Sequence, residues 1–585
     1  MDDSRAPALI SLERLRASLA DPGLTLPLEG VLAQRDAAEA AVRQIDDYIR
    51  PRLADLDAPL LAVVGGSTGS GKSTIVNALI GTPTTRVGVI RPTTRQPILV
   101  HAPVDAGWFA SDRILPGLAR VRGTVSIPGT PSSSAGDAPA AARINELMLL
   151  AQSEVPESMA IVDAPDIDSI ADENRALATQ LLAAADLWLF VTTANRYADA
   201  VPWRLLEGAA ARNITVGVVL NRVPEGAVDD VLPDLKAMLS ARGLADAPVF
   251  VIHEQPLDEL GMLPASAVAA PREWLHSIAG DRVERTRIAA RTVGGAVEDL
   301  AARVALIAEA RQEQLDWVQA RMTAAAEHYE DAVDAVDAAT SDGALLRGEV
   351  LARWQDFVGT TDFFRKVESW FSRARDSVSA WITGRPQSVI EVETQIEHGL
   401  HAVIVDQGGR AAASAWAELQ RSAAGRTVAE EHPELSRESI GFAESAASMV
   451  REWQGSLLRL VQDNAGSKRV RARVLSLGLN VVTVALMIVV FASTGGLTGG
   501  EIVIAGGSAV LGQKLLETVF GEDAVRRLAA QARQDLHERV ATLFEKERAR
   551  ISAALASARF GASPETLARE SDALVADVRR AAGDS

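Results

Sequence analysis

The sequence contains no cysteine, and aromatic residues make up only 4% of its 585 residues. The absence of cysteine excludes disulfide bonds, thiolate zinc sites and cysteine nucleophiles, and it fits a reducing compartment. Basic residues are in the minority, because 59 lysines and arginines stand against 77 acidic residues and give a formal net charge of −18. A general nucleic-acid-binding protein needs a basic surface, so we expect no nucleic-acid partner.

The first residues are acidic and lack an apolar run, so we expect no secretory signal and take synthesis in the cytosol as the default. The hydrophobic fraction of 48% is nevertheless too high for a disordered chain. The length predicts about four domains, or fewer if some of them are extended helices.

Apolar runs of strand length alternate with helical stretches between residues 58 and 280. Such alternation is typical of a doubly wound α/β domain. The preceding segment, residues 1–57, has apolar residues at helical spacing and is predicted to be an N-terminal helical segment that joins a neck. The strands are predicted at residues 59–64, 98–101, 159–162, 187–192, 214–220 and 249–252.

Beyond residue 280 the apolar residues recur at alternating spacings of three and four, which indicates the seam of a long helix. A helix of about 55 residues is expected here, with a kink at Gly294 and Gly295. We predict an elongated all-α neck and trunk over residues 281–470, and helices that return along it over residues 522–585.

A glycine-rich run at residues 66–73 follows the first predicted strand and precedes a helical stretch. It matches the pattern G-x-x-x-x-G-K-[ST] of P-loop nucleotide hydrolases, in which converging backbone N–H groups bind phosphates. Lys72 is the predicted catalytic residue that reaches the outer phosphates, and the Ser73 hydroxyl is a predicted ligand of Mg²⁺. Nucleotide contacts are predicted for Gly66, Ser67, Thr68, Gly69, Ser70, Gly71, Lys72, Ser73 and Thr74.

Two stretches carry a resemblance to a known family: residues 71–81 read GKSTIVNALIG, and residues 91–100 read RPTTRQPILV. They resemble the large GTPases of the dynamin superfamily, and the order of segments along the chain resembles the bacterial dynamin-like proteins. The resemblance implies GTP as the substrate and Mg²⁺ as the cofactor. It also implies that Thr94, with Thr93 as second choice, binds Mg²⁺ and positions the attacking water. An exposed turn is the alternative for both threonines.

Residues 161–166 read IVDAPD and resemble the D-x-P-G element of these GTPases. On this match Asp163 holds Mg²⁺ through water, and a strand-end capping role is the alternative. Asp166 stands where the family has a glycine whose N–H binds the γ-phosphate.

Asn221 and Arg222 match the start of the guanine-reading motif [NT]-K-x-D, although Pro224 replaces its aspartate. Both are predicted to contact the nucleotide, and an Asx turn is the alternative for Asn221. Thr68 stands where dynamin itself carries a glutamine-type residue.

Residues 474–493 form an uncharged run of about 20 residues, which is long enough to cross the hydrocarbon core of a bilayer. The basic residues Lys468, Arg469, Arg471 and Arg473 precede it and suit an anionic cytoplasmic leaflet. We predict a hydrophobic membrane hairpin over residues 471–521, either a transmembrane helix or a re-entrant wedge, that contacts membrane lipids through residues 474–512. A buried hairpin that caps the helical region is the alternative.

Residues 363–382 mix aromatic and basic side chains on one helical face, which suits either an interfacial helix or the core of a bundle. The whole pattern predicts a dynamin-like GTPase on the cytoplasmic side of the cell membrane. It would remodel that membrane and self-associate through its GTPase domain and helical trunk. A membrane-tethered regulatory GTPase or NTPase switch and a nucleotide-binding scaffold with little turnover are the alternatives.

Overall fold

The computed structural model of the protein describes residues 5–84, 96–123, 146–167, 172–341, 344–346, 354, 387–492 and 508–583. The chain forms two compact units. Unit 1 comprises Met1–Leu24, Glu29–Glu313 and Gly561–Ser585, and unit 2 comprises Thr25–Leu28 and Gln314–Phe560. The five segments predicted from the sequence divide the chain more finely than this and stay a prediction.

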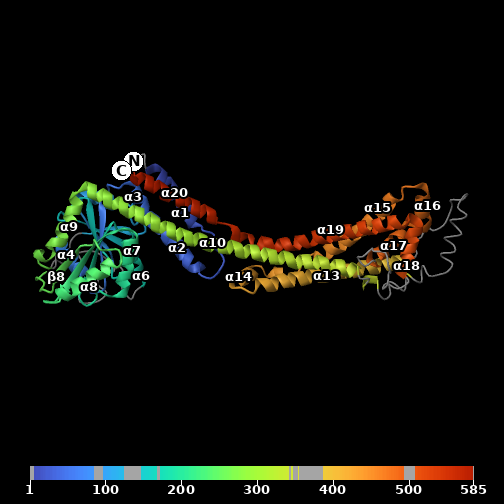
Figure 1. Ribbon diagram of the computed structural model, residues 1–585, viewed down its shortest axis with the longest axis horizontal. Helices are drawn as coiled ribbons and strands as arrows, with labels where there is room; N and C mark the ends of the chain where they lie inside the picture. Colours follow the sequence, from blue (N-terminus) through green and yellow to red (C-terminus); the bar gives the residue numbers. More distant parts are fainter. Residues whose placement is uncertain are drawn as a thin grey trace. The chain divides into compact units, whose positions relative to one another are not determined.

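Unit 1 contains a mixed sheet of eight strands in the order β3-β4-β2-β5-β1-β6-β7-β8. Figure 1 draws this sheet with helices of the same unit around it. Neighbouring strands are parallel except β2 and β5, which are antiparallel, so the sheet is mixed. The strands are β1 (Leu60–Gly66), β2 (Ile98–His101), β3 (Ala119–Arg122), β4 (Glu146–Ala151), β5 (Met159–Asp163), β6 (Leu187–Thr193), β7 (Thr215–Val223) and β8 (Val249–His253).

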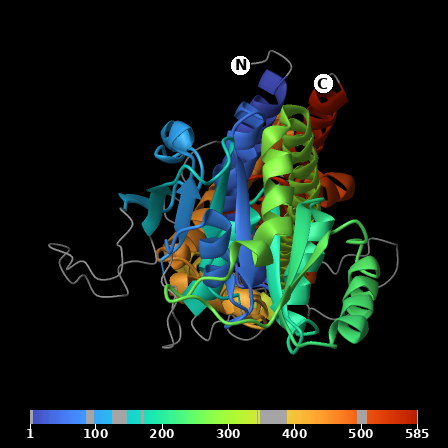
Figure 2. The ribbon, with the colours of Figure 1, turned by 90° about the vertical axis from the view of Figure 1, so that its left-hand side faces the viewer.

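The central strands are apolar because helices cover the sheet (Figure 2). Every residue of β1 and of β5 is buried, which is typical of strands enclosed on both faces. Helix α4 contacts β1 and β5, and α6 contacts β1. The helices of this region are α4 (Lys72–Ile80), α5 (Ala106–Phe109), α6 (Asp172–Ala183), α7 (Ala200–Ala211), α8 (Val228–Ser240) and α9 (Ala269–Gly280).

The N-terminal and C-terminal helices lie side by side in unit 1 (Figure 1). Helix α1 (Ala6–Ala20) packs along α20 (Pro564–Gly583), and its leucines at helical spacing are buried. The Ser11 hydroxyl donates to Asp577 over 2.6 Å, and the Ser18 hydroxyl donates to Glu570 over 2.6 Å. The end of the chain therefore belongs to the same unit as the sheet.

A buried polar cluster attaches the N-terminal helices to the sheet. The chain continues from α2 (Val31–Gln44) through the π-helix η2 (Ile45–Ile49) into α3 (Arg50–Ala54). Asp186, which is fully buried before β6, accepts hydrogen bonds from Leu61 N (2.7 Å), the Tyr48 hydroxyl (3.1 Å) and the Arg52 guanidinium. The Asp186 charge is thus balanced by a buried arginine, as a charge removed from water requires.

Helix α10 (Arg282–Ser341) is 60 residues long, and the division between the two units falls within it. It continues through Gly294 and Gly295, where the sequence predicts a kink. A Cβ atom at Gly295 would lie 2.1 Å from the Arg212 carbonyl oxygen, so glycine here permits the helix to approach that backbone closely.

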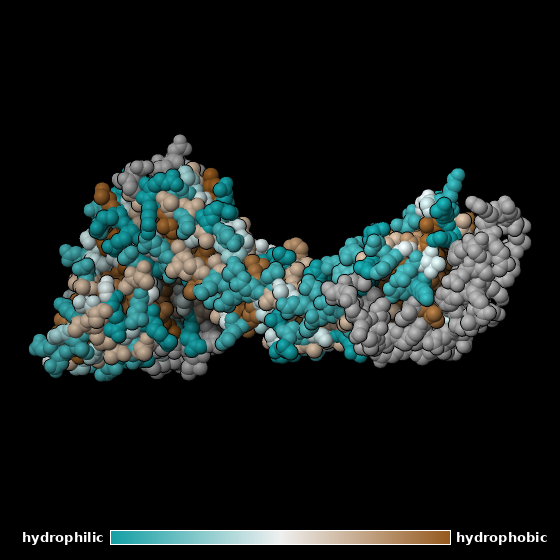
Figure 3. Space-filling view, turned by 45° about the vertical axis from the view of Figure 1, so that its right-hand side comes forward, coloured by the Kyte–Doolittle hydropathy of each residue, from teal (hydrophilic) through white to brown (hydrophobic). Residues whose placement is uncertain are grey.

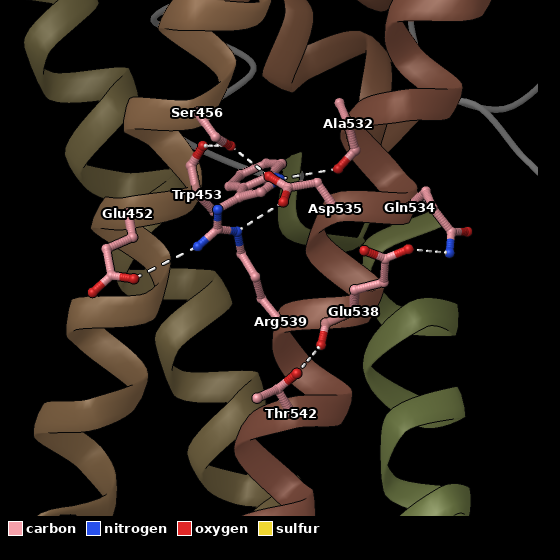
Figure 4. Close-up of polar contacts among 9 residues, drawn as sticks. All are labelled: Glu452, Trp453, Ser456, Ala532, Gln534, Asp535, Glu538, Arg539 and Thr542. Atoms are coloured by element: carbon pink, nitrogen blue, oxygen red, sulfur yellow. Dashed lines mark hydrogen bonds and ion pairs between the residues drawn. The ribbon is translucent and has the colours of Figure 1, made fainter.

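Helices are the only regular secondary structure among the described residues of unit 2. Trp453, fully buried on α15, donates its indole N–H to the Ala532 carbonyl of α19 over 3.0 Å (Figure 4). Beside it, Arg539 donates to Asp535 over 2.9 Å, and Asp535 also accepts from the Ser456 hydroxyl. The helices are α13 (Gln387–Leu419), α14 (Ala423–Glu431), α15 (Phe442–Asn464), α16 (Lys468–Leu477), α17 (Leu479–Ala492), α18 (Ser508–Phe520) and α19 (Glu522–Ala554).

The uncharged run of residues 474–493 begins at the end of α16 and continues as α17, whose side chains from Val481 to Phe491 are buried in unit 2. Helix α17 packs against α13, α15, α18 and α19, and the Phe491 ring lies 5.6 Å from that of Trp453. The buried-hairpin alternative predicts this packing. The face of unit 2 visible in Figure 3 is accordingly mostly hydrophilic over its described helices.

None of the described helices is by itself long and apolar enough to cross a membrane. One pair, Lys468–Leu475 with Leu479–Ala492, reaches that length and composition together, with a bend of 94° between its members. Residues 493–507, at the turn of the predicted hairpin, lie outside the described residues, as do all of residues 363–382 of the predicted aromatic helix. The membrane hairpin therefore stays a prediction.

Candidate nucleotide-binding site

The glycine-rich loop connects the end of β1 to the start of α4, as its sequence context predicts. Two of its glycines are required by close neighbours. A Cβ atom at Gly66 (φ +155°) would lie 2.1 Å from the Val191 carbonyl oxygen, and one at Gly71 (φ +93°) would lie 2.5 Å from Asn221 Nδ2. The loop thus packs tightly against residues of β6 and β7, and a side chain at either glycine would clash with them.

Lys72 is the first residue of α4, and its side chain is only 6% exposed. Its ammonium group donates to the carbonyl oxygens of Gly66 (3.0 Å) and Ser67 (3.1 Å). It also forms an ion pair with the carboxylate of Asp166, which lies in the segment after β5. The lysine is therefore held inside the loop, where P-loop chemistry needs its charge.

Ser73 and Asp163 meet where α4 begins and β5 ends. The Ser73 hydroxyl donates to Asp163 Oδ2 over 2.7 Å, and Asp163 is fully buried. Hydroxyl and carboxylate oxygens are the donors that Mg²⁺ prefers, and this ion commonly takes only one or two protein ligands beside water and phosphate. The pair therefore fits the predicted magnesium site. Thr93 and Thr94, the predicted switch threonines, lie outside the described residues.

Asn221 links the predicted base-reading segment to the loop. It lies within β7, so the Asx-turn alternative is wrong, and its buried Nδ2 donates to the Ser70 carbonyl oxygen over 2.8 Å. The next residue, Arg222, is exposed and has a positive φ of 51°. The structure thus brings Asn221 to the loop, whereas Arg222 points to solvent.

The remaining predicted residues lie on or directly after the loop. Ser67, Ser70 and Thr74 are buried, and Thr68 and Gly69 are partly exposed at its tip. Between the two buried serines the loop is accessible to solvent at Thr68 and Gly69. The roles assigned to these residues stay predictions.

Arg196, which follows β6 in the loop before α7, also contacts the glycine-rich loop, and no sequence motif indicates it. Its guanidinium donates to the Thr68 carbonyl oxygen over 2.8 Å and to Asp199 over 2.8 Å. Because β6 is the neighbour of β1 in the sheet, residues that follow β6 reach the same edge as the glycine-rich loop. The only indication in the sequence that Arg196 lies near the loop is its position just after a predicted strand.

The geometry of β1, loop and α4, with a buried lysine and a serine–aspartate pair, is that of a P-loop nucleotide-binding domain. Residues 61–221 match the profile of the Dynamin family. This range contains the loop, Asp163, Asp166 and Asn221. The chain therefore carries a dynamin-family GTPase domain, and the resemblance predicted from the sequence is confirmed for this part of the chain.

Two solved structures of an oligomerised bacterial dynamin pair, described as sensing and tethering membranes at long range, are similar to the chain. The first has a TM-score of 0.40 and 10% identity, and covers 100% of this chain and 96% of the other. The second has a TM-score of 0.37 and 11% identity, and covers 94% of this chain and 91% of the other. No curated protein matches the chain. The family assignment thus rests on the match over residues 61–221.

Proposed function

We propose that the protein binds and hydrolyses GTP with Mg²⁺ and couples this reaction to the remodelling of a membrane at its cytoplasmic side. The observation that carries the enzymatic part is the buried Lys72 in the loop between β1 and α4, next to the contact between Ser73 and Asp163. These are the groups that a P-loop hydrolase uses to bind phosphates and a metal ion.

Each group has a proposed task. The backbone N–H groups of the loop and the Lys72 ammonium bind the phosphates and stabilise the charge that develops during hydrolysis. Ser73 and Asp163 hold Mg²⁺, which neutralises phosphate charge when it is bound. Asn221 keeps the base-reading segment against the loop through its bond to the Ser70 carbonyl.

The choice of GTP rests on the family match and is the part that needs a direct test. Pro224 replaces the aspartate that reads guanine in the family, and the nearest carboxylates, Glu225 and Asp229, are both exposed. A competition experiment with a fluorescent GTP analogue should show displacement by GTP at much lower concentration than by ATP. Equal displacement by both nucleotides would contradict guanine selectivity and leave a general NTPase.

The membrane part is supported by α16, where Lys468, Arg469 and Arg471 are exposed next to the apolar α17. Clustered lysine and arginine residues attract anionic lipid headgroups by about 1 kcal/mol each. Reversal of all three charges to glutamate should abolish sedimentation with phosphatidylserine vesicles.

The matched control reverses Arg410, Arg421 and Arg426, three exposed arginines on or near α13 and α14. This variant should sediment like the wild type, because its charges lie away from α16. If both variants lose binding equally, the attraction is a property of net charge and α16 is not the contact. Deletion of residues 474–512 is a poorer test, since it removes α17 from the core of unit 2.

Remodelling requires that the protein self-associates and changes vesicle shape in response to nucleotide. Electron microscopy of vesicles with the protein and GTP should show tubules, fused vesicles or tethered clusters that are missing with Lys72→Ala. If vesicles stay unchanged while GTP is hydrolysed, the protein is a membrane-tethered regulatory GTPase.

A nucleotide-binding scaffold with little turnover is the second candidate, and the ion pair between Lys72 and Asp166 favours it. The Asp166 carboxylate next to the phosphates would repel the negative charge that develops on them during hydrolysis, and this would slow turnover. Single-turnover hydrolysis with Lys72→Ala as the control separates the two candidates, because a scaffold retains bound GTP without cleaving it.

A further inference from the structure

The Lys72 ammonium group has all three of its N–H bonds occupied by protein acceptors. An ammonium has three donors and no acceptor. Two donors go to the carbonyl oxygens of Gly66 and Ser67, and the third goes to the Asp166 carboxylate. A phosphate oxygen can therefore reach Lys72 only by replacing one of these acceptors.

Asp166 is the acceptor that a phosphate can replace. The two carbonyls belong to the loop that itself binds phosphate, whereas Asp166 lies beyond the end of β5 and is a separate anion. Its side chain is 17% exposed, and that of Lys72 is 6% exposed, so the pair is largely removed from water. A charge-assisted hydrogen bond in such surroundings is stronger than one between exposed groups.

The segment around Asp166 is held against β1 and the loop by backbone hydrogen bonds. Ala164 N donates to the Val64 carbonyl oxygen over 3.2 Å, and Ile167 N donates to that of Gly66 over 3.5 Å. Gly66 O thus accepts from both Lys72 and Ile167. Displacement of the Asp166 carboxylate consequently acts on a segment that begins directly after Asp163, at the predicted metal site.

We propose that Asp166 is a specificity-determining residue, whose carboxylate occupies on Lys72 the position that the terminal phosphate of a nucleoside triphosphate requires. This inference rests on the proposed function. When the triphosphate binds, its terminal phosphate replaces the Asp166 carboxylate on Lys72. The free energy needed to break the ion pair between Lys72 and Asp166 is subtracted from the binding free energy, so the affinity for the triphosphate is lower than it would be without Asp166. A diphosphate presents only its β-phosphate to Lys72 and lacks the γ-phosphate, so its affinity is reduced less.

The exchange also links nucleotide binding to a movement of the chain. Once a phosphate occupies Lys72, the Asp166 carboxylate faces a like charge at short range and is repelled. Residues 164–167 then leave their position against the loop. Asp166, which stands where the family has a glycine, thereby makes residues 164–167 respond to the γ-phosphate.

The test compares the full-length wild type with Asp166→Asn, Asp166→Gly and Lys72→Ala. The dissociation constants of Mg²⁺ complexes of GTPγS and GDP are measured by displacement of a fluorescent GDP analogue. Asp166→Asn should bind GTPγS about 10- to 100-fold more tightly than the wild type, which corresponds to a hydrogen bond to a charged group. The affinity of Asp166→Asn for GDP should change by less than about threefold, which is much less than the change expected for GTPγS.

Asp246→Asn is the matched control, because Asp246 is an exposed residue of unit 1 and its replacement removes the same charge. It should bind both nucleotides like the wild type. Asp166→Gly provides a second variant, and it should also bind GTPγS more tightly. A thermal unfolding curve of each variant without nucleotide confirms that it is folded.

The outcomes separate this inference from the proposed function. If the wild type binds GTPγS and Lys72→Ala does not, yet both Asp166 variants bind it no more tightly than the wild type, the role of Asp166 is wrong and the nucleotide site stands. Equal tightening of GTPγS and GDP also contradicts the inference, because a purely electrostatic effect would not select the outer phosphate. If the wild type binds neither nucleotide, both proposals are overturned.

Discussion

Replacement of Asp47 with asparagine should stabilise unit 1 at neutral pH. Asp47 lies in the π-helix η2, is only 5% exposed, and accepts a hydrogen bond from Gln180 Nε2 of α6 over 2.7 Å. Burial raises the pKa of this carboxyl from 3.8 to about 6, and the hydrogen bond from Gln180 opposes the rise. The negative charge of Asp47 thus destabilises the folded state at neutral pH.

The expected magnitude follows from that shift. A pKa raised by about two units corresponds to roughly 3 kcal/mol, because one unit corresponds to about 1.4 kcal/mol. The folded state retains the Asp47 proton at pH values where the unfolded state has lost it. The contribution of Asp47 to stability is therefore greatest below pH 4, falls as the pH rises from about 4 to about 6, and is constant above.

Asparagine keeps the oxygen that accepts from Gln180 and carries no charge at any pH. Calorimetric unfolding of Asp47→Asn should show a gain of about 2–3 kcal/mol at pH 7.5 and a much smaller one at pH 4.5. Asp46→Asn, in the same helix, is the control. Asp46 pairs with Arg16 over 2.7 Å, so its replacement should cost up to about 1 kcal/mol at pH 7.5. A gain for Asp47→Asn that is equal at both pH values would refute the reasoning.

Three further predictions concern single contacts. Asp186→Asn removes the charge that balances buried Arg52 and should destabilise unit 1 by about 3–5 kcal/mol in thermal unfolding; a cost below about 1 kcal/mol would argue against a buried ion pair. Trp453→Phe removes the indole hydrogen bond to the Ala532 carbonyl and leaves a smaller ring in the core of unit 2, so it should lower the stability of unit 2 by about 1–3 kcal/mol, and unchanged denaturant unfolding would contradict this. Arg196→Ala should weaken GTPγS binding a few-fold without a change in melting temperature, whereas unaltered binding would show that the bond to Thr68 does not shape the loop.

Local patterns predicted the centre of the α/β domain well. Six apolar runs of strand length correspond to β1, β2, β5, β6, β7 and β8, because buried strands in this sheet are continuously apolar. Strands β3 and β4 were missed. The β3 residues Ala119–Arg122 alternate with two arginines, and an edge strand of this kind carries little hydrophobic signal.

Contacts between distant parts of the chain were not predictable from periodicity. The packing of α1 along α20 joins residues more than 500 positions apart, as the bond from Ser11 to Asp577 illustrates. Similarly, the sequence showed Asp166 as a departure from the family pattern but not its ion pair with Lys72, which depends on how the segment after β5 folds back on the loop. The motifs predicted the residues of the candidate site, and only the tertiary structure showed which of them are in contact.

The length of an apolar run predicted a membrane contact, but length does not distinguish a bilayer from a protein core. Residues 481–491 of α17 are all buried inside unit 2, and a helix in such a core needs the same continuous apolar sequence as a helix in a bilayer. The helices that cover it, α13, α15, α18 and α19, are amphipathic segments whose apolar faces needed a partner. Because α17 is buried, the exposed basic residues of α16 are the better support for a membrane contact.

The central claim is that the loop at residues 66–73 binds a magnesium nucleotide through Lys72. Calorimetric titration of the full-length protein with GTPγS and Mg²⁺ tests it most directly. We expect saturable binding of one nucleotide per chain, lost or weakened at least 100-fold in Lys72→Ala, because the ammonium contacts the outer phosphates. Equal binding by the wild type and Lys72→Ala would contradict the assignment of this site.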